Sequence, residues 1–109
     1  DFLINEIPDL DFIHDVYWST YAGKNPEDYI KMFAASGRMN HVHFKDMKEE
    51  PKGPICPCGE GVIDFAPVVK LCNELGIVNA LVEQDNAAIL PDTLGQVERS
   101  VKYVAANLI

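Results

Sequence analysis

The sequence predicts an α/β fold in which parallel strands are joined by helices, and three observations support this. Strand-like and helix-like segments alternate along the chain in the order β, α, β, α, β, α. No hairpin signal separates the strands, and such alternation is typical of parallel strands with helical crossovers. The strands are short and strongly apolar, as expected where both faces of a sheet are covered.

The first strand and the first helix are predicted within the first third of the chain. Leu10–Trp18 has strand character and ends in aromatic side chains. A helix is expected to begin after Asn25, because Asn is a favoured N-cap, Pro26 suits the first helical position, and acidic residues follow. It is expected to run to about Ser36 and to stop at Gly37.

The stretch Met39–Asp46, MNHVHFKD, is predicted to be the central strand. Its apolar residues alternate with His41, His43 and Lys45. Residues two apart in a strand share a face, so two imidazoles and one ammonium point the same way. Burying these groups in an ordinary core would be costly without partners. This face therefore meets water, or a ligand that uses nitrogen donors and positive charge.

The second half of the chain continues the alternation. Residues 48–61 are rich in Pro, Gly and charge and are expected to form a long loop, either functional or disordered. Asp64 is expected to cap a second helix that ends at Gly76, and Ile77–Asp85 to form the third strand. The apolar positions of that helix follow helical spacing: Phe65, Val68, Val69, Cys72 and Leu75. A last helix over 91–108 aligns one apolar stripe: Leu94, Val97, Val101, Val104 and Leu108.

Composition narrows the functional classes. The chain has 109 residues, enough for one small domain, with 17 acidic against 9 basic residues and a net charge of −8. This charge argues against nucleic-acid binding, which needs clustered Lys and Arg. No stretch is apolar enough to span a bilayer, and no signal peptide opens the chain. The three cysteines have no paired CxxC spacing, so we expect free thiols in a reducing, cytoplasmic compartment rather than structural zinc.

Three β/α units by themselves leave two strand edges open. The first nine residues also look like the last turn of a helix, so the sequence opens abruptly. Two interpretations follow: the chain is a piece of a larger α/β protein, or it completes its sheet by self-association.

One residue that metals favour stands near the end of each predicted strand: Asp15, His43 and Glu83. The carboxyl ends of parallel strands lie at one rim, so these side chains are expected to converge. A donor set of oxygen, nitrogen and oxygen suits Mn²⁺, Co²⁺, Mg²⁺ or Zn²⁺. Carboxylates at strand ends also serve as helix caps or ion-pair partners, which is the alternative interpretation.

Four motifs together resemble a known family. HVHFKD (residues 41–46), with DVYW before it and GEGVIDF and VEQD after it, is similar to the C-terminal part of xylose-isomerase-like sugar phosphate isomerases/epimerases. These enzymes are (β/α)₈ TIM barrels, and the similarity covers nearly the whole chain. It implies that residues 1–109 are a C-terminal fragment of such a barrel domain, its last three β/α units. The first five units would lie outside this sequence, and the isolated chain is expected to be inactive.

The same resemblance implies a metal-dependent reaction on a small-molecule sugar or sugar phosphate. Family members hold a divalent metal with Glu, Asp, His and Glu on successive strands; Asp15, His43 and Glu83 match the last three. The reaction is a proton transfer through an enediolate, with Glu83 as one of two acid/base groups. The alternatives are a lyase, dehydratase or hydrolase that acts on keto-sugars or inositols with the same metal, and a non-catalytic self-associating fragment.

Two residues near the metal ligands are predicted to contact substrate. Lys45 shares a strand face with His43 and is suited to neutralising oxyanion charge; the alternative is a salt bridge to one of three carboxylates: Asp46, Asp85 or Glu60. Trp18 stands where some family members have a histidine, three residues after the metal-binding Asp. This departs from the ketose 3-epimerase pattern and suggests an apolar wall for a sugar ring, or simple packing at the rim.

Three further polar residues stand close to the predicted metal ligands in the sequence or on the same strands. Glu60 lies between two glycines in the loop after the second strand, within reach of substrate. His41 is expected to be a histidine of the barrel core, with orientation of a metal ligand as the alternative. His14 neighbours Asp15 and should point to the opposite face of its strand.

Overall fold

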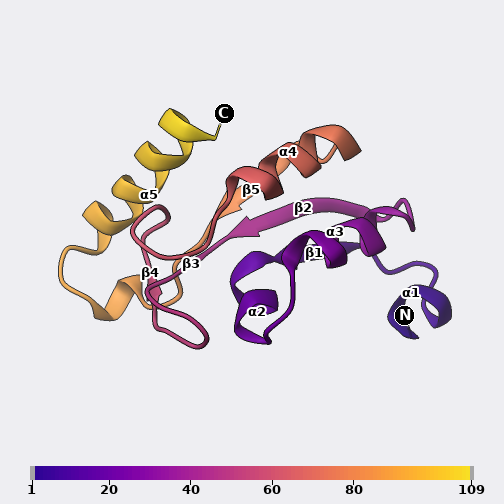
Figure 1. Ribbon diagram of the computed structural model, residues 1–109, viewed down its shortest axis with the longest axis horizontal. Coiled ribbons are helices and arrows are strands. Elements are labelled where there is room, and N and C mark those ends of the chain that lie inside the picture. The colour runs from indigo at the N-terminus through magenta and orange to yellow at the C-terminus, as the bar shows by residue number, and fades with distance from the viewer. Residues whose placement is uncertain (1, 109) are drawn as a thin grey trace.

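The computed structural model describes residues 2–108, which contain a three-stranded sheet (Figure 1). The strand order is β1 (Phe12–Asp15), β2 (Met39–Phe44) and β5 (Asn79–Val82). Both outer strands pair with β2 in parallel. The predicted parallel α/β arrangement is therefore confirmed.

Two helices cover one face of this sheet: α3 (Pro26–Ala34) and α4 (Ala66–Leu75). Ile30 on α3 and Val68 on α4 are buried in one core with Val42 and Phe44 of β2. Alternate residues of each strand point into this core, so the residues between them occupy the opposite face. On that opposite face Ile13 and Leu81 remain exposed. The chain therefore presents one covered and one open sheet face.

The residues predicted to cap the helices do so in the structure, with one difference at the start of α4. Asn25 is the N-cap of α3, and its Oδ1 accepts a hydrogen bond of 2.9 Å from the backbone N–H of Glu27. Gly76 ends α4 in the left-handed conformation, with φ of 72°, which Gly adopts without steric cost. Asp64 accepts a hydrogen bond from the Ala66 N–H, although Phe65 occupies the N-cap position itself.

The first strand is shorter than predicted. It ends at Asp15, and helix α2 (Val16–Tyr21) follows at once, so Trp18 is helical rather than extended. The reason is local: Asp15 is the N-cap of α2, and its Oδ1 accepts a hydrogen bond from the Trp18 N–H. The third strand is also shorter than predicted, although the Glu83 N–H still donates to the Phe44 carbonyl.

The predicted loop over residues 48–61 contributes one strand to an antiparallel pair that the sequence did not reveal. Strand β3 (Asp46–Met47) pairs antiparallel with β4 (Ile55–Cys56). The expectation of no hairpin is therefore wrong at this point. The Pro and Gly residues that favoured an irregular loop lie largely between and after these two-residue strands.

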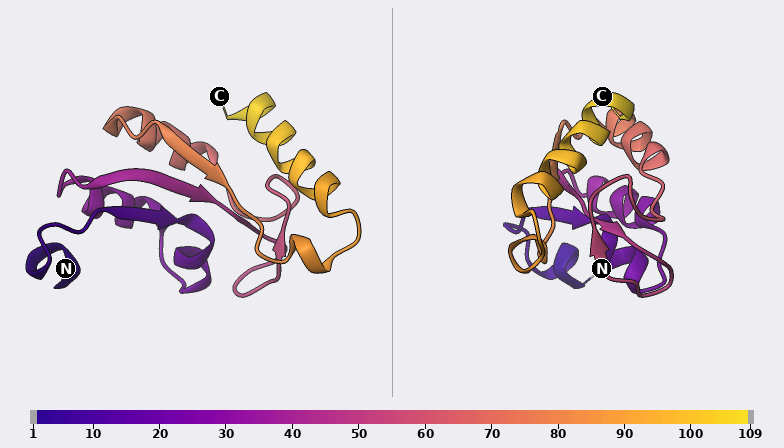
Figure 2. Two further views of the ribbon diagram at one scale, coloured as in Figure 1. Left: turned by 180° about the vertical axis from the view of Figure 1, so that it is seen from behind. Right: turned by 90° about the vertical axis from the view of Figure 1, so that its left-hand side faces the viewer.

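The chain ends in α5 (Thr93–Asn107), preceded by the short helix η1 (Ala87–Ile89), and begins with α1 (Phe2–Glu6). Figure 1 and the left-hand view of Figure 2 place α1 and α5 toward opposite ends of the longest axis of the molecule. The predicted last helix is confirmed, but Leu94, Val97 and Val101 of its apolar stripe are exposed. Leu75 on α4 is exposed as well. Within residues 2–108 no helix is both long and apolar enough to cross a membrane.

Candidate active site

The open face of the sheet gathers three side chains from three strand ends. Asp15 is paired with His43 in the β1–β2 register, and Glu83 follows directly after β5. Each of the three offers one ligand atom, and these atoms all lie within 4.8 Å of one another. The structure therefore brings together the three residues that the sequence singled out.

The closest contact in this cluster joins His43 and Glu83. Nδ1 of His43 lies 2.8 Å from Oε2 of Glu83 and 3.9 Å from Oδ2 of Asp15. The second carboxylate oxygen of Asp15, Oδ1, accepts the 3.1 Å hydrogen bond from the Trp18 N–H that caps α2. Asp15 is thus both a helix cap, as the alternative interpretation expected, and a member of the cluster. Its role as a metal ligand stays a prediction.

A buried lysine completes the cluster. Nζ of Lys45 lies 3.0 Å from Oδ2 of Asp15 and 3.1 Å from Oε2 of Glu83. It also lies 2.9 Å from Oδ2 of Asp85, and its side chain is only 3% exposed. Burial by itself lowers the pKa of Lys45, but the hydrogen bonds to the three carboxylates outweigh it and raise the pKa above its ordinary value. The ammonium is therefore charged at neutral pH.

Asp85 also belongs to this cluster, and the sequence had suggested it only as one of three alternative salt-bridge partners for Lys45. Lys45 pairs with Asp85, whereas Asp46 and Glu60 bind the Gly59 N–H and Arg99, respectively. A usable signal was present, because Glu83 and Asp85 are two residues apart directly after a strand and continue its alternation.

Trp18 lies at the edge of the cluster, whereas Glu60 is engaged elsewhere. The Trp18 side chain is about half exposed, and Nζ of Lys45 lies 5.6 Å from its ring centroid. Glu60 accepts a 2.6 Å hydrogen bond from Nε of Arg99 on α5. Contact of either residue with a substrate stays a prediction.

The two other histidines lie on different faces of the sheet. His14 points into the covered face, where its Nε2 lies 3.1 Å from Oγ of the buried Ser19, and burial lowers its pKa. His41 is half-buried on the open face, two residues before His43. The predicted orientation of His14 is confirmed, and the role of His41 stays a prediction.

Asp46 points away from the cluster and holds the following loop. Its buried carboxylate accepts hydrogen bonds from four backbone N–H groups, at 2.7 to 3.1 Å: Met47, Gly59, Gly61 and Ile63. A Cβ atom on Gly61 would lie 2.3 Å from Oδ1 of Asp46, so this close approach requires glycine. The neighbouring residues Lys45 and Asp46 therefore have different roles. Lys45 pairs with the carboxylates of the cluster, and Asp46 fixes the loop by accepting its backbone N–H groups.

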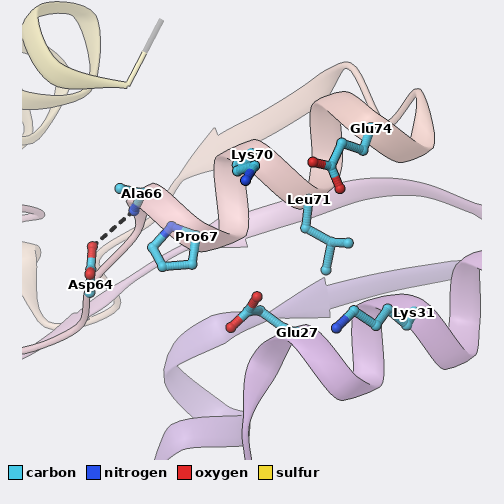
Figure 3. A pocket seen from close by; sticks show the side chains of 8 residues that line it. All are labelled: Glu27, Lys31, Asp64, Ala66, Pro67, Lys70, Leu71 and Glu74. Carbon is cyan, nitrogen blue, oxygen red and sulfur yellow. Dashed lines mark hydrogen bonds between the residues drawn. The ribbon is translucent and has the colours of Figure 1, made fainter.

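A groove of about 510 Å³ lies on the helical side of the sheet, between α3 and α4. Figure 3 shows Glu27 and Lys31 of α3 opposite Lys70 and Glu74 of α4. The groove is lined by charges of both signs and lies across the sheet from the Asp15–His43–Glu83 cluster. It therefore adds nothing to the strand-end site.

The donor set of the cluster fits a divalent metal. Two carboxylates and one imidazole are ligands that Mn²⁺, Co²⁺ and Zn²⁺ accept. The Lys45 ammonium contacts both carboxylates, which shows that their oxygens already converge on one positive charge. Asp15, His43 and Glu83 are therefore the residues that would hold a metal ion at this site.

Two solved structures have a fold similar to that of this chain. A sugar phosphate isomerase/epimerase from Parabacteroides distasonis superposes on 97% of this chain with a TM-score of 0.75 and 27% identity. A second structure of that description from the same organism covers 87% of the chain, with a TM-score of 0.68 and 23% identity. The resemblance to the xylose-isomerase-like sugar phosphate isomerases/epimerases is confirmed. The three-stranded sheet with its helices accordingly matches part of a TIM barrel of the isomerase/epimerase fold.

Two curated relatives of this chain are inosose dehydratases, from Yersinia enterocolitica and Serratia proteamaculans. Each is 38% identical to this chain over a region that covers 50% of the chain and 24% of the relative. No protein-family model matches the sequence. The chain spans about a quarter of the length of these curated relatives, and 30% and 34% of the two isomerase/epimerase structures. The proteins that this chain resembles are thus sugar phosphate isomerases/epimerases and inosose dehydratases.

Proposed function

We propose that this chain carries part of the active site of a metal-dependent sugar or sugar phosphate isomerase/epimerase. The observation that carries the proposal is the convergence of Asp15, His43 and Glu83 at three adjacent strand ends. Ligands bind at this end of the strands in parallel β/α barrels. The isomerase/epimerase structures share this fold, which makes the strand-end rim the place to expect the reaction.

In this proposal Asp15, His43 and Glu83 hold the metal, and a fourth ligand comes from a part of the barrel that this chain does not contain. A bound divalent ion would polarise neighbouring carbonyl and hydroxyl oxygens of a sugar and so acidify the adjacent C–H group. The half-exposed rim of the cluster leaves an approach for such a substrate, since the Glu83 side chain is 40% exposed.

Glu83 is the proposed acid/base group. Within residues 2–108 the contacts of Glu83 with His43 and Lys45 both use Oε2, and neither of them uses Oε1. A carboxylate in that position can accept a proton from a substrate carbon and return it to the neighbouring carbon or oxygen. The half-exposed Trp18 would form an apolar wall for the sugar ring, and Lys45 and Glu60 would contact substrate oxygens.

The remainder of the barrel is the proposed partner of the open face. We propose that residues 1–109 supply the last three β/α units, with exposed Ile13 and Leu81 facing the interior of the completed barrel. Without the other units the chain lacks a ligand and most of the pocket wall, so the isolated chain is expected to be inactive.

A dehydratase is the second candidate, and one observation favours it. Both curated relatives are inosose dehydratases, at 38% identity. Elimination of water begins with the same proton abstraction, so the same Glu83 and metal site would serve it.

The two candidates differ in their products. The full-length protein, loaded with Mn²⁺, is incubated in D₂O with ketoses, ketose phosphates and inososes. Isomerisation or epimerisation conserves substrate mass apart from exchanged deuterium, whereas dehydration removes one water. Glu83→Gln should abolish both reactions, while Glu98→Gln, which removes an exposed carboxylate on α5, should not. Turnover that survives in Glu83→Gln would contradict the assignment.

A further inference from the structure

We propose that the Lys45 ammonium and a divalent metal compete for the same two oxygens, Oδ2 of Asp15 and Oε2 of Glu83. When the metal binds, Lys45 remains paired with Asp85 alone. In the metal-free site Lys45 would stand in for the metal. This inference rests on the metal centre proposed above and concerns the charge balance of that site without metal and its affinity for the metal.

The first support is that Lys45 occupies the ligand atoms themselves. Nζ of Lys45 contacts Oδ2 of Asp15 at 3.0 Å and Oε2 of Glu83 at 3.1 Å. These are also the oxygens that face Nδ1 of His43. Because Oδ1 of Asp15 accepts the Trp18 N–H at the start of α2, Oδ2 is the oxygen left for a metal. The metal and the ammonium therefore need the same atom of Asp15.

The second support is electrostatic. A metal bound at about 2.0 to 2.2 Å from these oxygens would lie at most about 5 Å from Nζ in its present position. At that separation a divalent ion and an ammonium repel each other strongly in a partly buried site. Lys45 must then move away from Asp15 and Glu83, or it must weaken metal binding.

The third support is that Lys45 has a partner outside the metal-ligand set. Oδ2 of Asp85 lies 2.9 Å from Nζ, and Asp85 is not among the three residues whose donor atoms converge. An ammonium as buried as that of Lys45 would be costly to leave unpaired. Asp85 removes this cost, because Lys45 can give up two carboxylates and keep the third.

The consequence is that a positive charge balances the Asp15 and Glu83 carboxylates both with and without metal. Without metal, Lys45 neutralises carboxylates that would otherwise repel one another. With metal, it pairs with Asp85 at the rim, close to the Trp18 ring, where it is available to substrate oxygens.

The first test is Mn²⁺ affinity, measured by titration calorimetry on the full-length protein. Lys45→Met should bind Mn²⁺ about tenfold more tightly than wild type, because the competing charge is gone. Its metal-free melting temperature should fall, and Mn²⁺ should raise it by more than in wild type. Lys102→Met removes an equal charge from an exposed pair with Glu98 on α5 and should change nothing. Unchanged or weaker binding by Lys45→Met would overturn the inference and leave the metal centre standing.

The second test keeps Lys45 and so does not depend on the folding of Lys45→Met. Asp85→Asn removes the alternative partner, and Lys45 should then hold Asp15 and Glu83 more firmly. Mn²⁺ affinity should fall about tenfold, whereas Glu98→Gln should leave it unchanged. Equal affinity in Asp85→Asn and wild type would overturn the inference. If wild type itself binds no Mn²⁺, the proposed metal centre fails and this inference fails with it.

Discussion

Nδ1 of His43 lies 2.8 Å from Oε2 of Glu83, although 40 positions separate the two residues in the chain. The contact exists because β2 and β5 are parallel neighbours, which sets their carboxyl ends side by side. It joins an imidazole to a carboxylate on the open face of the sheet, where Asp15 and Lys45 also converge. Four predictions follow from this cluster and from the loop beside it.

Removing two of the proposed ligands should abolish metal binding. An Asp15→Ala/Glu83→Ala double variant of the full-length protein should lose at least about 100-fold in divalent-metal affinity, since a single imidazole remains from this chain. Elemental analysis and calorimetry would measure it. Glu74→Ala, on the exposed side of α4, is the matched control and should bind like wild type. Retention of stoichiometric metal by the double variant would contradict the site.

Truncating Trp18 should weaken substrate binding more than turnover. The ring is half exposed beside the cluster, so Trp18→Ala removes an apolar surface without opening the core. We expect KM to rise about tenfold with kcat nearly unchanged. Trp18→Phe should recover most of the affinity. A fall in kcat with constant KM would instead indicate a role in the chemical step.

Asp46 should be important for stability rather than for metal binding. Asp46→Asn replaces a buried oxygen that accepts backbone N–H groups with a donor, and should cost about 3 kcal/mol in the free energy of unfolding. Chemical denaturation measures this loss, and amide exchange should show lost protection at Gly59, Gly61 and Ile63. Asp64→Asn keeps a competent capping side chain on α4 and should have little effect.

Cys58 should make the protein sensitive to alkaline pH. Burial, assisted by the negative charge of Asp46, raises the pKa of the Cys58 thiol from 9.0 to about 12. The folded state then holds a proton that the unfolded state releases, so this contribution is complete below pH 9 and is lost as the pH rises toward 12. Denaturation at increasing pH should show falling stability, with a shallower fall in Cys58→Ala. Rapid alkylation of native Cys58 near neutral pH would contradict this.

Local signals were sufficient for most of the elements. Asn25 and Gly76 bound helices in the sequence and in the structure because capping depends on one side chain or one backbone conformation. Local signals failed at Trp18, where apolar character suggested a strand. Asp15 caps a helix there instead, with its Oδ1 accepting the Trp18 N–H.

The apolar stripe of α5 shows a different limit. Helical spacing correctly predicted the helix, but Leu94 and Val101 are exposed. Periodicity reports which face of a helix is apolar; whether that face is covered depends on what packs against it. The same holds for Leu75 on α4.

The sequence by itself determined the alternation of strands and helices, the start of α3 after Asn25 and the end of α4 at Gly76. It also determined that Asp15, His43 and Glu83 stand near the ends of three strands. These depend on neighbours within a few positions. Only the tertiary structure decided that Lys45 pairs with Asp15, Glu83 and Asp85 together, and that Asp46 holds Gly59 and Gly61 instead. Those choices depend on the register between strands that are distant in sequence, and a carboxylate in an isolated sequence has many possible partners.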